Sequence, residues 1–345
     1  MITFRALARL FVFAFVLSFG VPAFAADPVA DFYKGKQITL IVGSPAGGIY
    51  DIYARALSRH LSKHVPGNPQ VVVQYMPGSG AIAAVNHVYN VAPKDGTVIV
   101  APSNTTAFLP LLGTEAAKFD PKKILWLGSP TQETGVFFVW QTSKAKTFDD
   151  AQKTEVIVGS NGPQGHSGIL AKVLNDILKT KLKSIDGYAG PAEAILAMER
   201  GEIEGRAGIF YNQLKASYAA QLKDGRFRVL LHYGAKPHPE LGKIPYAPDL
   251  IKNDADKQVF FAAQAPLSVG YPLLMGPDIP ADRQAAMRKA VADTYADKEF
   301  LAEAEKAKID VAPISGAGVE KIVLDTYALP ADVVARFRKL YDAAE

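Results

Sequence analysis

The sequence of 345 residues contains no cysteine. This absence excludes disulfide bonds, thiolate metal sites and a cysteine nucleophile. Long runs of like charge are also missing. There are 38 basic and 34 acidic residues, and two of the basic ones, Arg5 and Arg9, precede residue 26. From residue 26 onward the net charge is therefore +2, and it is too dispersed to indicate a protein that binds nucleic acid or a membrane surface.

The apolar run Leu10–Phe19 is too short to cross a bilayer comfortably, because a transmembrane helix needs about 20 apolar residues. It follows the two arginines and precedes Ala23-Phe-Ala25, a small-x-small cleavage site. This order is typical of a secretory signal peptide. We predict that residues 1–25 are removed after Ala25 and that the mature protein is exported.

Strands and helices are expected to alternate after residue 36. The mature chain of 320 residues exceeds what one hydrophobic core normally supports, so two domains are expected. In its first part the patterns predict strands and helices in alternation: Gln37–Val42, Tyr50–Val65, Gln70–Gln74, Ala81–Asn90 and Thr97–Ala101. Such alternation favours a mostly parallel, doubly wound α/β sheet.

A second α/β unit follows. Gly135–Gln141 is apolar without alternation, which predicts a strand buried on both faces and a crossover into a second domain. Further strands and helices are predicted at Glu155–Gly159, Ser167–Leu178, Leu182–Tyr188, Pro191–Arg200 and Arg226–Tyr233. We interpret Lys236–Asp254 as a loop and Leu267–Gly276 as a strand that returns to the first domain. The predicted domains are 26–138 with 262–345, and 139–261, joined by a hinge of two crossings.

The tetrapeptide Ile-Val-Gly-Ser occurs twice, at 41–44 and 157–160, each time between an apolar strand and an amphipathic helix. Backbone N–H groups at a helix start lack intrahelical partners, and the dipole there is positive. Such a start binds a carboxylate or phosphate. Two of them, with a third at Ala189–Pro191, predict two domains closing on one anion.

The candidate ligand-binding residues come from these loops and from Ser103 to Thr106, which follows a strand. Asp51 equally fits a role in stabilising the helix dipole, and Tyr50 could face the ligand or pack on a strand. Ser103 and Thr105 could donate hydroxyls or cap a helix. The full candidate set is Ser44, Ala46, Gly47, Gly48, Tyr50, Asp51, Ser103, Thr105, Ser160, Gln164, His166, Ser167, Ala189, Gly190 and Pro191.

Enzyme motifs fit poorly. The peptide Gly165-His-Ser-Gly-Ile169 has isoleucine where the nucleophile elbow Gly-x-Ser-x-Gly has its final glycine. His60 and His64 have the spacing of a zincin motif, but Leu61 stands where that motif has glutamate. A phosphate-binding Walker loop is absent, and Gly78–Ala83 matches the dinucleotide fingerprint only loosely. We therefore predict no catalytic residue, no metal and no cofactor.

Several motifs together carry a resemblance to a known family. They are Ile-Thr-Leu-Ile-Val-x-x-Pro-Ala-Gly-Gly-x-x-Asp at 38–51, Met-Pro-Gly-Ser-Gly at 76–80, Ala-Pro-Lys-Asp-Gly-Thr at 92–97, and Gly-Tyr-Ala-Gly-Pro-Ala at 187–192. In this order, with the second glycine-rich loop, they make the chain similar to the periplasmic substrate-binding proteins of tripartite tricarboxylate transporters, the Bug family.

The resemblance implies a type II periplasmic binding fold that holds a carboxylate between two α/β domains. It also implies a monomer in the periplasm that delivers its ligand to an integral membrane permease. Ser44 and the pair Ile49-Tyr50 depart from the family pattern, so we expect an aromatic or otherwise bulky carboxylate. Two alternatives stay open: an exported α/β hydrolase or lyase, and a binding protein of similar fold that serves an ABC or TRAP transporter or a sensor.

Overall fold

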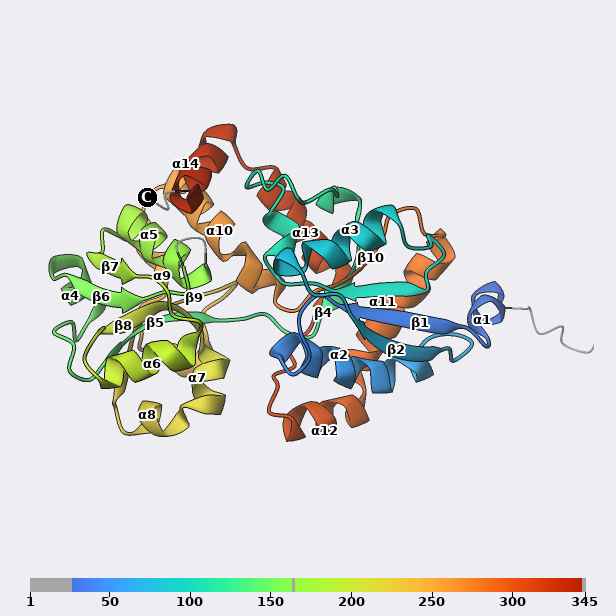
Figure 1. Ribbon diagram of the computed structural model, residues 1–345, viewed down its shortest axis with the longest axis horizontal. Helices are drawn as coiled ribbons and strands as arrows, with labels where there is room; N and C mark the ends of the chain where they lie inside the picture. Colours follow the sequence, from blue (N-terminus) through green and yellow to red (C-terminus); the bar gives the residue numbers. More distant parts are fainter. Residues whose placement is uncertain (1–26, 163–164, 343–345) are drawn as a thin grey trace, which may run out of the picture.

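A computed structural model places two β-sheets in two lobes that lie side by side (Figure 1). The structure describes residues 27–162 and 165–342. The predicted signal peptide, with its cleavage site at Ala25, and the candidate Gln164 lie outside the described residues. No helix within the described ranges has both the length and the apolarity needed to span a membrane.

The first sheet has six strands in the order β11-β4-β10-β3-β1-β2. β1 pairs in parallel with both β2 and β3, whereas β10 runs antiparallel to β3 and β4. β11 is also antiparallel to β4, so the predicted mostly parallel sheet is found only among β2, β1 and β3, and the other three strand pairs are antiparallel. The strands are β1 (Gln37–Val42), β2 (Gln70–Tyr75), β3 (Val98–Ala101), β4 (Leu125–Ser129), β10 (Leu273–Met275) and β11 (Ile314–Ser315).

Helices cover both faces of this sheet. Successive side chains of β1 point to opposite faces, and because those from Leu40 to Val42 are apolar, both faces are buried. Leu40 and Val42 belong to one core cluster, and Ile41 belongs to another that includes Val88. The helices of this lobe are α1 (Pro28–Tyr33), α2 (Ile49–His60), α3 (Ile82–Asn90), α11 (Ala281–Ala296), α12 (Lys298–Lys306) and α13 (Gly316–Tyr327). The lobe is doubly wound, as predicted.

The second sheet has five strands in the order β7-β6-β8-β5-β9. All six residues of β5 are buried, as its uninterrupted apolar sequence predicts, and the strand runs antiparallel to β8 and β9. β6 pairs in parallel with β7 and β8. The strands are β5 (Gly135–Trp140), β6 (Val156–Gly159), β7 (Leu182–Ile185), β8 (Gly205–Phe210) and β9 (Phe227–Tyr233).

The second lobe contains two elements that the sequence patterns misassigned. The segment 236–254, expected to be a loop, contains the short helix α9. The expected strand 267–276 begins inside α10, but its second half contains β10, which returns to the first sheet as predicted. An apolar run alone does not distinguish a buried helix from a strand. The helices are α4 (Phe148–Lys153), α5 (His166–Leu178), α6 (Pro191–Glu199), α7 (Tyr211–Ser217), α8 (Ala219–Lys223), α9 (Ala247–Leu250) and α10 (Asp254–Val269).

Two chain crossings between the lobes touch one another. One joins β4 to β5, and the other joins α10 to β10. The Ser129 hydroxyl donates to the Thr131 carbonyl (2.8 Å) and accepts from the Tyr271 backbone N–H (2.9 Å). Gly270 has φ +62° and ψ −113°, and a Cβ there would overlap the Thr131 carbonyl oxygen. The crossings therefore form one close-packed hinge.

The last described helix, α14 (Ala331–Asp342), returns to the second lobe (Figure 1). Val333 and Phe337 lie in the core cluster of that lobe. Arg336 forms ion pairs with Asp176 on α5 and Asp256 on α10. The predicted boundaries assigned this helix to the first domain, whereas its apolar side chains pack against the second. The sequence pattern predicted the helix and its apolar face, but not the lobe against which that face packs.

Candidate functional site

The first glycine-rich loop joins β1 to α2 and is fixed by the carboxylate of Asp51. This side chain, only 4% exposed, accepts hydrogen bonds from the Gly47 N–H (2.7 Å), the Tyr75 hydroxyl (2.7 Å) and Arg55 Nε (2.9 Å). Burial alone would raise the pKa of Asp51, but hydrogen bonds from Tyr75, Gly47 and Arg55 hold it below its usual range. One amide predicted to bind the ligand is therefore already engaged.

The other residues of this loop are more open. Ala46, Gly47 and Gly48 are exposed, and Gly48 caps α2 without a side-chain hydrogen bond. Gly47 has φ +89°, a conformation that favours glycine. The Ser44 hydroxyl is buried and has no hydrogen-bond partner among the described residues. A buried polar atom without a partner is costly, so this hydroxyl is available to a ligand that reaches it.

Tyr50 connects α2 to the segment after β3. Its hydroxyl accepts from the Asn104 backbone N–H (3.0 Å), and its ring packs edge-on against Tyr271 with centroids 5.0 Å apart. Burial raises the pKa of Tyr50. Ser103 and Thr105, half-buried beside it, have hydroxyl oxygens 3.1 Å apart. The structure thus brings the α2 start and the segment after β3 together, as the parallel order β3-β1 requires.

The second glycine-rich loop, between β6 and α5, is built over a buried arginine. Arg206 on β8 is 3% exposed and donates to the Asn161 side-chain oxygen (3.2 Å) and to the carbonyl of Gly159 (3.3 Å). Asn161 also accepts from the hydroxyl of Ser167 (2.7 Å). The Ser160 hydroxyl is engaged with Gly162 and Asp186. Ser160 and Ser167 therefore shape the loop from within.

Arg206 places a positive charge beneath the start of α5. Burial lowers its pKa to about 10, so the guanidinium stays charged at neutral pH. His166, the first residue of α5, has a pKa lowered to about 4 by burial and by the nearby Arg206, so its ring is neutral. Its Nε2 is buried and, among the described residues, unpaired. This helix start has no side-chain cap hydrogen bond, and it presents a neutral ring and a positive field to an anion.

The third predicted helix start, at α6, resembles the first. The Ala189 N–H donates to the carboxylate of Glu193 (2.6 Å), as Gly47 donates to Asp51 in α2. Gly190 caps the helix and Pro191 occupies its first turn. In both α2 and α6, an acidic side chain four residues along takes a loop amide. α5 has no acidic residue in its first turn.

The start of α2 borders a cavity between the lobes. Ile49 and Ile52 on α2 and Phe210, the last residue of β8, line this cavity of about 460 Å³, together with Tyr53 and Tyr271. The ring of Phe210 lies 5.9 Å from that of His166. None of the predicted candidates within the described residues lines this cavity, so the closing of two helix starts on one anion stays a prediction.

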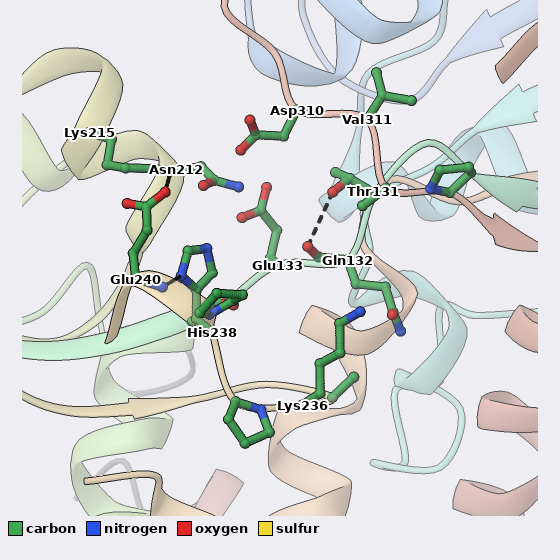
Figure 2. A pocket seen from close by; sticks show the side chains of 16 residues that line it. Thr131, Gln132, Glu133, Asn212, Lys215, Lys236, His238, Glu240, Asp310 and Val311 are labelled. Carbon is green, nitrogen blue, oxygen red and sulfur yellow. Dashed lines mark hydrogen bonds and ion pairs between the residues drawn. The ribbon is translucent and has the colours of Figure 1, made fainter. Parts of the chain in front are cut away.

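A neighbouring cavity of about 660 Å³ lies over the hinge and contains none of the predicted candidates (Figure 2). Glu133, Asn212 and Asp310 line both cavities. Sequence reasoning missed these residues and Arg206. Two signals were present: an arginine inside the apolar strand 205–210, and a glutamate two residues before the buried strand 135–140.

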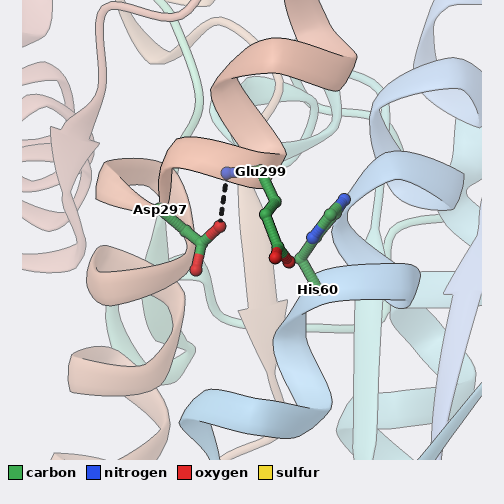
Figure 3. A group of neighbouring side chains, drawn as sticks. All are labelled: His60, Asp297 and Glu299. Atoms are coloured by element: carbon green, nitrogen blue, oxygen red, sulfur yellow. Dashed lines mark hydrogen bonds between the residues drawn. The ribbon is translucent and has the colours of Figure 1, made fainter.

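One group of side chains in the described ranges has the spacing of metal ligands: His60, Asp297 and Glu299 (Figure 3). Lys63 Nζ lies 2.9 Å from Asp297 and 2.6 Å from Glu299, so a cation already occupies the position between the carboxylates. His60 Nε2 is 2.8 Å from Glu303, and His64 Nε2 is 3.0 Å from Asp297. This group is a surface ion-pair network between α12 and the end of α2.

Comparison with known proteins gives relatives in sequence. No protein-family model matches the chain. The "UPF0065 protein in gbd 5'region" of Cupriavidus necator is 25% identical over 251 residues, which cover 71% of this chain and 73% of that protein.

Comparison with solved structures confirms the fold. A TctC solute-binding protein from Polaromonas superposes with a TM-score of 0.70 and 19% identity, over 89% of this chain and 98% of that one. Rpa4515 of R. palustris, solved with adipate, gives a TM-score of 0.60 and 16% identity, over 88% and 97%. The fold that the resemblance implies, that of a two-domain periplasmic binding protein, is confirmed.

Proposed function

We propose that this protein is an extracytoplasmic solute-binding protein. It captures a carboxylate between its two lobes and delivers it to the membrane permease of a tripartite transporter. No bond is made or broken in this process. One observation carries the proposal: the start of α5, which has no side-chain cap and lies over the buried cation of Arg206, is adjacent to Phe210, and Phe210 lines the same cavity as Ile49 and Ile52 of α2.

The second lobe supplies the attraction for a negative group. α5 is 13 residues long, and its first N–H groups lack intrahelical partners. A charge-assisted hydrogen bond contributes about 1.5–3 kcal/mol, so a few of them hold a carboxylate firmly. The neutral ring of His166 adds a donor or acceptor without adding charge. The first lobe supplies exposed loop glycines and the Ser44 hydroxyl.

The walls of the cleft favour a ligand with an apolar body. Ile49 and Ile52 are exposed on α2, and Phe210 faces the same cavity from the second lobe. The cavity of about 460 Å³ falls within the usual range for small-molecule sites. We therefore propose an aromatic or otherwise bulky carboxylate. The structural neighbour solved with adipate supports carboxylate binding on this fold.

Export completes the proposal. The arrangement of Arg5, Arg9, the apolar run and Ala23–Ala25 fits a cleaved signal, and a solute-binding protein acts outside the cytoplasm. Mass spectrometry of the periplasmic fraction is expected to give a protein that begins at Ala26. A chain that keeps residues 1–25 would contradict cleavage.

A thermal-shift screen of residues 26–345 against aliphatic and aromatic carboxylates tests the binding function. A ligand at one hundred times its Kd raises the free energy of unfolding by about 2.7 kcal/mol, which is easily detected. We expect His166→Ala to weaken the shift and His87→Ala, on α3, to leave it unchanged. If no carboxylate stabilises the protein, or if both variants respond like wild type, the proposal is wrong.

A further inference from the structure

The hinge holds a buried carboxyl group that the proposed function does not use. Glu133 lies on the first crossing and is 4% exposed. Its Oε1 accepts from the Tyr271 hydroxyl (2.8 Å), while its Oε2 has no partner anywhere in 27–162 or 165–342. Both interlobe cavities are lined by this residue. An open lone pair on a buried carboxyl is a strong acceptor site.

Three separate elements converge on this group. In Figure 2 the Glu133 carboxyl points towards the side chains of Asn212, at the start of α7, and Asp310, in the segment after α12. Asn212 comes from the second lobe and Asp310 from the first, so residues of both lobes line the cavities around Glu133. The site therefore gathers two carboxyl groups and an amide, all of which have oxygen acceptors.

Cations in the surroundings do not pair with Glu133. Lys215 Nζ is bound to Glu240 (2.9 Å). The remaining titratable groups that line the two cavities are Lys236, His238, Lys308, Tyr53 and Tyr271. Burial, and then the charge of Asp310, raise the pKa of Glu133 to about 7, against the opposing hydrogen bond from Tyr271. A nearby positive group would favour the ionised form.

We infer that Glu133, together with Asn212 and Asp310, binds the ammonium group of the ligand. The inference rests on the proposed function and specifies it: the ligand is an amino-bearing carboxylate. Its carboxylate lies at the start of α5, its body lies against Ile49 and Phe210, and its ammonium group donates to Glu133 Oε2. A second carboxylate at this position would face two like charges and bind only when Glu133 is protonated.

Matched ligand pairs test whether an ammonium group or a second carboxylate binds at Glu133. Isothermal titration at pH 8 would compare 6-aminohexanoate with hexanoate and adipate, and L-phenylalanine with 3-phenylpropanoate. We expect at least one amino compound to bind tenfold or more tighter than its unsubstituted partner. Glu133→Gln should abolish that advantage and change the affinity of the unsubstituted acid less than threefold. Glu240→Gln, in the same cavity but already paired with lysine, is the matched control.

The direction of the pH dependence gives an independent readout. Affinity for the amino compound should rise between pH 6 and pH 8 as Glu133 ionises, and Glu133→Gln should lose this dependence. If instead adipate binds tighter than 6-aminohexanoate, binds better at pH 6, and is retained by Glu133→Gln, then Glu133 is a protonated donor and the inference is wrong. If the amino compounds and their unsubstituted acids bind with equal affinity, the inference fails while the proposed function stands. If neither class binds, the proposed function fails as well.

Discussion

The two glycine-rich loops share the tetrapeptide Ile-Val-Gly-Ser, yet buried charges of opposite sign support them. Under the first loop, the carboxylate of Asp51 accepts a hydrogen bond from a loop amide and another from the Tyr75 hydroxyl, and it forms an ion pair with Arg55. Under the second loop, Arg206 donates to uncharged oxygens, so its positive charge is not cancelled by a carboxylate. Identical sequence at the turn therefore hides a difference in electrostatic role. The first loop is stabilised from within, whereas the second lies over the guanidinium of Arg206, which we propose attracts the anion.

Removal of Asp51 should have the largest effect on stability. Asp51→Ala leaves the Gly47 N–H and the Tyr75 hydroxyl without their acceptor and is expected to lower the free energy of unfolding by about 2–4 kcal/mol. Asp31→Ala, in the exposed first turn of α1, should cost less than about 0.5 kcal/mol. Urea denaturation of both variants checks this. An equal loss in both would mean that Asp51 contributes only through the helix dipole.

Removal of Arg206 should act on binding. Arg206→Met removes the positive charge beneath α5, and we expect carboxylate affinity to fall by about 10–100-fold, given a few kcal/mol between charges near a protein surface. Arg228→Met, exposed on β9, should change affinity less than twofold. Titration at two salt concentrations completes the test, because the loss from a buried charge should persist at high salt. If Arg206→Met binds the carboxylate with unchanged affinity, the proposed difference in electrostatic role between the two loops is wrong.

A smaller effect is expected inside the second loop. Ser167→Ala removes the hydroxyl that donates to Asn161, and it should lower the free energy of unfolding by about 1 kcal/mol. Ser58→Ala, near the surface of α2, should be close to neutral. Thermal denaturation measures both. A loss of binding without a loss of stability in Ser167→Ala would place this hydroxyl on the ligand instead of in the scaffold.

The hinge adds a third buried ionisable group, Glu133, whose effect on stability depends on pH. The pKa of Glu133 is raised to about 7, so the folded state favours the protonated form. The stability that this provides is fully present below the ordinary pKa of 4.5 and is lost as pH rises through 7. Glu133→Gln should therefore be more stable than wild type by about 3 kcal/mol at pH 8 and not at pH 4.5. A difference that is independent of pH would contradict this.

The sequence predicted the parts of the molecule that depend on local pattern. The strands and helices around both glycine-rich loops follow from apolar runs, periodicity and glycine, and these also located the helix starts. Glu133 could not be predicted, because its burial requires Tyr271 from the other crossing and Asp310 from a third segment. The sequence predicted that Asp51 lies in the first turn of a helix. It did not predict the hydrogen bond from the Gly47 N–H, because that bond depends on the loop conformation.

A structure of residues 26–345 with a bound carboxylate tests the central claim most directly. We expect the carboxylate oxygens within hydrogen-bond distance of the first amides of α5 and of the His166 ring, with the α2 loop closed over the same ligand. A carboxylate bound away from the start of α5, with no contact to the second glycine-rich loop, would contradict the account.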